Sequence, residues 1–169
     1  MSRRIAGGAV LAALVAASCA RVGPVSRPTG DGAARIFSVA ALSFEAPAAW
    51  TADGDPRRVK LVSPGGEAVV EVKATAVPGS SADCLARAGA ALERGAASLS
   101  GLRRHDSTFA GRKAIAQEAD HGGWHGWAWA TCDRGEQYRV FLSGRAPVSR
   151  ETLEVQRRLV ATARLGGTP

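Results

Sequence analysis

The stretch WHGWAWATC, residues 124–132, decides how this chain folds. Read as a β-strand, it places alternate side chains on opposite faces of a sheet. One face carries small side chains, namely Gly126, Ala128, Ala130 and Cys132. The other face carries His125, Trp127, Trp129 and Thr131. Because small side chains allow another element to approach closely, the first face predicts a helix packed directly on this strand.

A helix with a matching small face is expected earlier in the chain. It begins near Ser80 or Ser81, where Ser80 is a good N-cap with Asp83 three residues later. At 100° per residue, one face of this helix collects small and apolar residues. They are Cys84, Ala88, Ala91, Leu92, Gly95 and Leu99.

The N-terminus has the pattern of a secretory signal peptide. A basic start with Arg3 and Arg4 leads into an uncharged apolar run over residues 5–17. This run is shorter than the ~20 residues that a membrane-spanning helix needs. The signal peptide is therefore expected to cover residues 1–18 and to direct the chain out of the cytoplasm.

The end of the signal peptide, LVAASC at residues 14–19, resembles the lipobox of bacterial lipoproteins. The leucine usual three places before the cysteine is Ala16 here. The resemblance implies that Cys19 becomes the first mature residue and carries diacylglycerol and acyl chains such as palmitate. It implies a periplasm-facing membrane anchor, and Ala20 favours the outer membrane over the inner. Secretory cleavage after Ala20 is the alternative.

An exported chain whose Cys19 carries lipid retains an even pair of cysteines, Cys84 and Cys132. Oxidising compartments favour a disulfide between such a pair, and a disulfide requires Cα atoms within ~7 Å. We therefore predict that the helix of Cys84 lies across the strand of Cys132 and is bonded to it. Two reduced, buried cysteines are the alternative.

The rest of the pattern predicts one α+β domain, an antiparallel sheet flanked by helices, over residues 35–166. Residues 19–34 would be the lipidated cysteine and a flexible tether, since their Pro, Gly and Ser show no apolar periodicity. A last helix is expected from Ser149. The other expected strands cover residues 36–40, 42–45, 59–63, 67–75, 106–116 and 137–143, with a break at Ala110-Gly111.

The tryptophan face has two interpretations. Trp127 and Trp129 either fill the core beneath the C-terminal helix, which we favour, or line a groove for a ligand or partner together with Trp124 and His125. Trp124 follows a Gly-Gly turn and is the better candidate for exposure.

A metal site is not expected from these residues. His121 and His125 are four apart, a spacing that faces one side only on a helix, and zinc needs three or four ligands. Asp120 and His105 could join them only through the fold. No cofactor-binding motif is present.

Function classes with clear motifs are not indicated. The sequence has no Gly-x-Ser-x-Gly elbow, phosphate-binding glycine loop or His-Glu-x-x-His, so we expect no enzyme. The net charge is +7, but the basic residues are scattered in pairs such as Arg57-Arg58 and Arg103-Arg104. Without a dense basic patch, nucleic-acid binding is not expected.

Three segments resemble the PsbP-like α/β/α sandwich domains. They are FSVAALSFEAPAAW at residues 37–50, STFAGRKAIAQEA at 107–119, and GEQYRVFLSGRAPVSRETLEVQRRLVATARL at 135–165. The resemblance implies that fold and an adaptor or assembly role without a shared catalytic site. The expected function is thus a lipid-anchored envelope module that binds another protein. The alternative is a carrier or sensor of a small apolar ligand on the Trp127 and Trp129 face, and an unrecognised hydrolase comes third.

Overall fold

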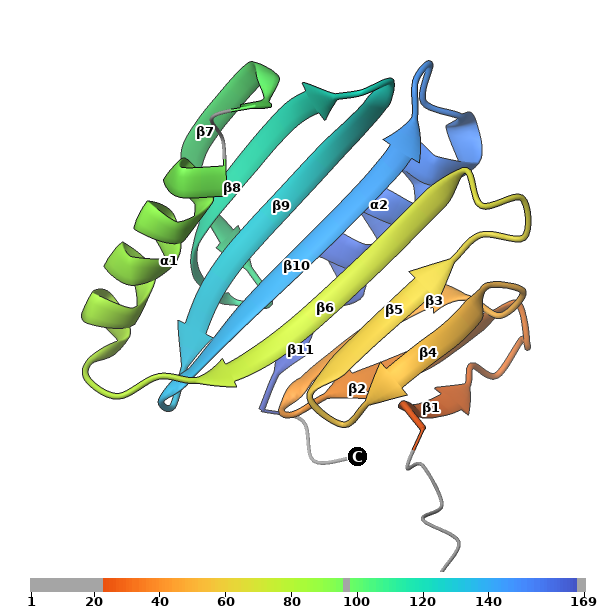
Figure 1. Ribbon diagram of the computed structural model, residues 1–169. Coiled ribbons are helices and arrows are strands. Elements are labelled where there is room, and N and C mark those ends of the chain that lie inside the picture. The colour runs from red at the N-terminus through yellow and green to blue at the C-terminus, as the bar shows by residue number, and fades with distance from the viewer. Residues whose placement is uncertain (1–22, 96–97, 167–169) are drawn as a thin grey trace, which may run out of the picture.

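The computed structural model describes residues 23–95 and 98–166, which form two sheets and two helices (Figure 1). The first half contains β1 (Val25–Pro28), β2 (Ala34–Val39), β3 (Leu42–Pro47), β4 (Thr51–Asp55), β5 (Arg58–Val62), β6 (Ala68–Ala76) and α1 (Ser81–Gly95). The second half contains β7 (Ser100–Phe109), β8 (Arg112–His121), β9 (Trp124–Asp133), β10 (Glu136–Arg145), α2 (Arg150–Thr162) and β11 (Arg164–Leu165).

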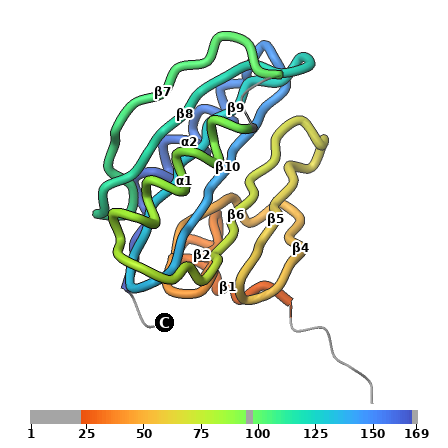
Figure 2. Tube along the Cα trace, turned by 60° about the vertical axis from the view of Figure 1, so that its left-hand side comes forward, coloured from red at the N-terminus to blue at the C-terminus, as the bar shows by residue number. Residues whose placement is uncertain are grey.

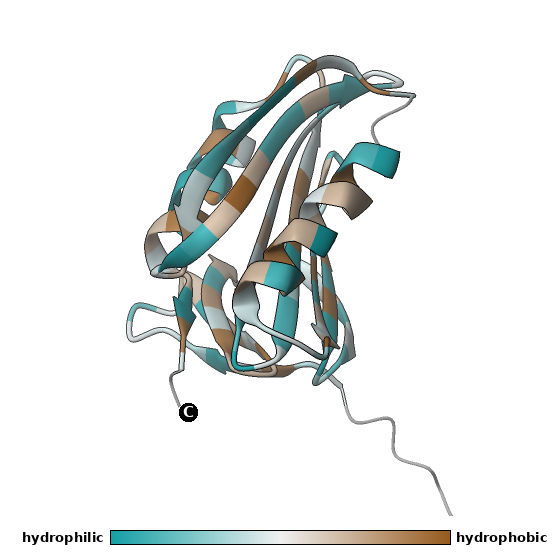
Figure 3. Ribbon diagram, turned by 90° about the vertical axis from the view of Figure 1, so that its left-hand side faces the viewer, coloured by the Kyte–Doolittle hydropathy of each residue, from teal (hydrophilic) through white to brown (hydrophobic). Residues whose placement is uncertain are grey.

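The larger sheet has seven antiparallel strands in the order β4-β5-β6-β10-β9-β8-β7. The smaller sheet has the order β1-β2-β3-β11 and packs with α2 on one face of the larger sheet. Figure 3 shows α1 and α2 on opposite sides of the larger sheet. The expected fold class, an antiparallel sheet flanked by helices, is therefore confirmed, although the strands form two sheets.

The main core lies on the α2 side of the larger sheet. Alternate side chains of β10 point into it, and Tyr138, Val140 and Leu142 are almost fully buried. Val155 and Leu159 of α2 join the same cluster. The largest fully buried side chains elsewhere in this core include Phe37, Phe44, Phe109, Leu42 and Leu61. This side supplies most of the buried apolar area, which is the main favourable term in folding.

On the opposite face, α1 lies over β8, β9 and β10, with most of its contacts to β9. Cys84 and Cys132 form a disulfide, and their Cα atoms are 6.2 Å apart. Behind it Ala88 and Leu92 pack against Ile115 and against Ala128 and Ala130 of β9. The predicted crossing of this helix and this strand is confirmed.

The start of α1 is fixed by the predicted N-cap. The Ser80 hydroxyl accepts a hydrogen bond from the Asp83 backbone N–H at 3.1 Å. The Asp83 carboxylate accepts one from the Ser80 hydroxyl at 2.6 Å and one from the Ser80 backbone N–H at 3.3 Å. These hydrogen bonds from Ser80 lower the pKa of Asp83, because they favour its charged form.

The expected flexible tether over residues 19–34 is wrong for its described C-terminal part. Residues Val25–Pro28 form β1 and pair antiparallel with β2. A turn follows, in which the Thr29 hydroxyl donates to Asp31 and its backbone N–H to the Ala34 carbonyl. β1 is an edge strand with mostly exposed side chains, so it shows no apolar alternation and can hold Pro28.

Two further strand expectations need correction. The break expected at Ala110-Gly111 is the turn of a hairpin, with positive φ at both residues, but its strands β7 and β8 are longer than the expected residues 106–116. The short strand β4 was not expected at all. Both β4 and β7 are edge strands with largely exposed side chains, so burial imposes no periodicity on their sequences.

Across residues 23–95 and 98–166, no helix is long and apolar enough to cross a membrane. The expected signal peptide and Cys19 lie outside the described residues.

Candidate functional site

The predicted tryptophan face divides between core and rim. Trp129 is buried in the main core, where its ring stacks on Phe109 with centroids 5.7 Å apart. Trp127 is half-buried against the same core and meets His125 edge to face, with centroids 4.5 Å apart. These two tryptophans therefore fill space on the α2 side and do not form an open groove there.

His125 is held between two carboxylates of β8. Its Nε2 lies 2.9 Å from Glu118 Oε1, and its Nδ1 lies 2.7 Å from Asp120 Oδ1. Arg103 also pairs with Glu118, at 2.6 Å. Within the described ranges, no three His, Cys, Asp or Glu side chains are placed to hold a metal ion. This cluster is a hydrogen-bonded network of His125, two carboxylates and Arg103.

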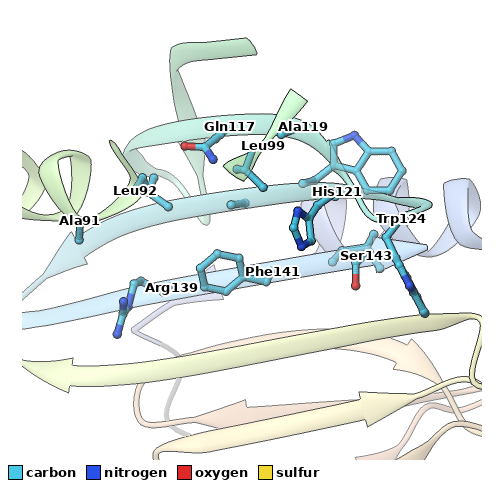
Figure 4. Close-up of a pocket in the computed structure, with 14 residues that line it drawn as sticks. Ala91, Leu92, Leu99, Gln117, Ala119, His121, Trp124, Arg139, Phe141 and Ser143 are labelled. Carbon is cyan, nitrogen blue, oxygen red and sulfur yellow. The ribbon is translucent and has the colours of Figure 1, made fainter. Parts of the chain in front are cut away.

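The opposite face of the sheet contains a pocket of about 560 Å³ beside the C-terminal half of α1, which we call the α1 pocket (Figure 4). This volume lies within the ~300–1,000 Å³ typical of small-molecule sites. One side of the pocket is lined by Ala91 and Leu92 of α1 and by Leu99, which lies between α1 and β7. The strands contribute Gln117, Ala119 and His121 from β8, Trp124, Gly126, Trp127 and Ala128 from β9, and Arg139, Phe141, Leu142 and Ser143 from β10.

The pocket arises because α1 is shorter than the strand it covers. The small face of β9 continues past Ala128 to Gly126, but α1 ends at Gly95. A Cβ built at Gly126 would come no closer than 3.7 Å to another heavy atom, the Leu142 carbonyl oxygen. The floor of the α1 pocket is thus open space above small residues, and not a tightly packed core.

The walls of the α1 pocket are mainly apolar. Leu92 and Leu99 lie on the helix side and Phe141 on the strand side, while Arg139 lies at one end and Trp124 at the other (Figure 4). Phe141 is 40% exposed, one of the large hydrophobic side chains on the described surface. An aromatic ring open to water beside an apolar hollow is typical of a ligand site.

Gln117 brings an amide into this apolar surrounding. Its side chain is 8% exposed, and its Oε1 accepts no hydrogen bond from any residue that the structure describes. Leaving a buried polar atom unpaired costs about 1–3 kcal/mol. By rotation about its last side-chain bond, the amide can present either a donor or an acceptor to an occupant of the pocket.

Besides Gln117 and Arg139, the pocket contains the polar side chains of His121 and Ser143. His121 Nδ1 lies 3.1 Å from the Ser98 carbonyl oxygen, so the ring is oriented by the segment after α1. In the described contacts, His121 makes no hydrogen bond to Ser143. These two side chains therefore do not form the nucleophile–base pair that acyl transfer requires.

Sequence reasoning found only part of this site. Trp124, singled out for exposure, lines the α1 pocket, but His125 and Trp129 do not. Phe141 and Gln117 were missed. A signal for Phe141 existed, since it falls in the β10 face opposite Tyr138 and Leu142 and so places an aromatic ring where a polar residue is expected.

A scan against protein-family models finds no match, and a search of curated proteins finds none either. Solved structures do match. The chain resembles cyanobacterial PsbP (CyanoP) from Synechocystis at 13% identity and a TM-score of 0.52, over 88% of this chain and 96% of that one. It also resembles LpqN of Mycobacterium tuberculosis, a protein involved in cell envelope biogenesis, at 11% identity and a TM-score of 0.52, over 85% and 91%.

At these identities the likeness concerns the fold alone. Both matches span nearly all of the described residues and most of the compared chain. The chain therefore has a PsbP-like fold.

Proposed function

We propose that this chain is an exported, lipid-anchored protein of the cell envelope that binds a small apolar ligand in the α1 pocket and is not an enzyme. The observation that carries the proposal is the α1 pocket itself, an apolar hollow of about 560 Å³ on the thinly covered face of the sheet. This moves the ligand site from the Trp127 and Trp129 face to the opposite face.

Burial of apolar surface would drive binding. An apolar ligand in the pocket would cover Phe141 and the exposed sides of Leu92 and Leu99, at about 25 cal/mol per Å² removed from water. The pocket is formed by strands and a disulfide-linked helix, so little ordering cost opposes binding. An envelope protein partner would remain compatible with this site if it inserted an apolar side chain.

Gln117 supports a ligand with some polar character. A buried amide without a partner lowers stability, and such departures from favourable local chemistry are expected at functional sites. An occupant with a hydroxyl, amide or carbonyl group could pair with it.

The envelope location rests on the N-terminal sequence, the cysteine pair and one structural neighbour. The lipobox resemblance predicts acylation at Cys19, and the Cys84–Cys132 disulfide is typical of oxidising compartments. LpqN, which shares the fold, is involved in cell envelope biogenesis. Acyl chains on Cys19 would hold the domain at a membrane facing the periplasm, with the outer membrane favoured.

Filling the pocket tests the binding proposal. Gly126→Val should keep the protein folded, since valine suits a strand and the added Cβ meets no close neighbour. The valine side chain would occupy the pocket floor and take up room that a ligand needs. Overpacking of the occupied pocket, at about 1–3 kcal/mol, should reduce affinity for the neutral fluorescent probe N-phenyl-1-naphthylamine about tenfold or more. Fluorescence titration measures the affinity of the probe for the unaltered protein and for Gly126→Val.

The matched control is Thr108→Val, which places the same side chain on exposed β7 outside the pocket. It should bind the probe like the unaltered protein. Equal binding by Gly126→Val and Thr108→Val, or no binding by the unaltered protein, would overturn the α1 pocket as a ligand site.

Replacing the unpaired amide tests the role of Gln117. Gln117→Leu should unfold at the same or a higher denaturant concentration, because it removes a buried acceptor without a partner. It should still bind N-phenyl-1-naphthylamine. Gln137→Leu is the control, since Gln137 is equally buried on the same face of the sheet but outside the pocket. A loss of more than about 1 kcal/mol in Gln117→Leu alone would show that the amide stabilises the fold.

The anchor is tested by Cys19→Ala. We expect this variant to leave the membrane fraction and to lose the mass of the acyl chains, because two or more chains give stable anchoring and none gives no anchor. Fractionation and intact-mass measurement check this. A Cys19→Ala protein that stays in the membrane fraction with unchanged mobility would contradict lipidation at this residue.

A further inference from the structure

A second cavity adjoins the α1 pocket on the same face of the sheet. Its volume is about 300 Å³, and it is lined by Arg58, Glu71, Lys73, Arg139 and Phe141. Arg139 and Phe141 also line the α1 pocket, so the two cavities share a wall. We call this second hollow the cationic cavity.

The sheet register places three cations of the cationic cavity in one row. Arg58 on β5 lies opposite Lys73 on β6, and Lys73 lies opposite Arg139 on β10. Like charges directly opposite each other on neighbouring strands are destabilising. Such a row lowers the free energy of unfolding unless an anion lies between the cations.

The one carboxylate of the cationic cavity pairs with only one end of this row. Glu71 pairs with Arg58 at 2.7 Å and lies opposite Lys60, a further cation of this face. In the described part of the chain, neither Lys73 nor Arg139 has a carboxylate oxygen within 4.0 Å. The positive charge is therefore concentrated next to the apolar pocket.

Two carboxylates farther along the same face belong to the edge strand β4. Asp55 lies opposite Arg58, and Asp53 lies opposite Lys60. Asp55 Oδ1 already accepts hydrogen bonds from the backbone N–H groups of Arg57 and Arg58, at 2.7 and 3.0 Å. Neither Asp53 nor Asp55 forms an ion pair with Lys73 or Arg139 among the described residues.

Taken together, an apolar hollow and a cationic hollow that share Arg139 and Phe141 match the two parts of one molecule. We propose that the ligand is a single-chain amphiphile with an anionic head group. Its hydrocarbon chain lies in the α1 pocket, and its carboxylate, phosphate or sulfate is held by Lys73 and Arg139. This inference rests on the proposed function and adds the class of ligand to it.

The location of the head group fits the exposure of these residues. Lys73 is exposed and Arg139 half-buried, so the head group keeps contact with water while the chain is removed from it. Partly exposed ion pairs are weak singly and are screened by salt. We therefore expect the two cations together to contribute about tenfold in affinity at low salt and less at high salt.

The experiment compares dodecyl phosphate, dodecyltrimethylammonium and dodecyl maltoside, each below its micelle concentration, as competitors of N-phenyl-1-naphthylamine. Dodecyl phosphate should displace the probe at about tenfold lower concentration than the other two. The advantage should shrink in high salt. In Lys73→Gln/Arg139→Gln, whose own affinity for the probe is measured first, the three competitors should displace the probe at equal concentrations.

The control is Lys113→Gln/Arg27→Gln, which removes the same charges from β8 and β1, outside both cavities. It should keep the preference for dodecyl phosphate. The Lys73→Gln/Arg139→Gln variant should also unfold at the same or a higher denaturant concentration, because it relieves cross-strand repulsion.

The outcomes separate the two proposals. Equal displacement by all three competitors on the unaltered protein would overturn the anionic head group and leave the apolar site in place. A preference for dodecyl phosphate that survives in Lys73→Gln/Arg139→Gln would overturn the assignment to these two residues. Absence of probe binding to the unaltered protein would overturn the apolar site as well.

Discussion

The contact between α1 and β9 is the constraint on which the rest of this structure depends. Cys84 and Cys132 bring the two backbones within 6.2 Å between Cα atoms, and only small side chains such as Ala88 and Ala130 fit between them. A helix held so close to a strand must leave a hollow wherever it ends before the strand does. The α1 pocket lies at that point, above Gly126. Figure 2 shows the trace of α1 lying over β9.

The two faces of the larger sheet differ in how fully they are packed. The α2 face carries the extensive core, whereas the α1 face carries a small cluster under one helix. Two features that lower stability, the unpaired Gln117 amide and the Lys73–Arg139 pairing, lie on the α1 face. Departures from favourable local chemistry gather at functional sites in folded proteins and are offset elsewhere. Here the α2 face provides that offset.

How much the sequence could predict depends on whether a pattern is local. The alternation in β9 and the helical face with Cys84 are local, so the fold class and the crossing of α1 over β9 followed from them. β1 and most of β7 were not predicted, because exposed edge strands need no apolar alternation. The α1 pocket was not predicted, because it depends on where α1 ends relative to β9. Gln117 becomes a candidate only once its neighbours are known.

The most direct test is hydrogen exchange of the backbone amides before and after reduction of the Cys84–Cys132 disulfide. Closing a loop of 48 residues stabilises by about 2–4 kcal/mol. If the bridge holds α1 on β9, reduction should let the Ser81–Gly95 amides exchange by local opening, about tenfold or more faster than those of β6 and β10. Amides of α1 that stay as protected as those of β10 after reduction would contradict the account.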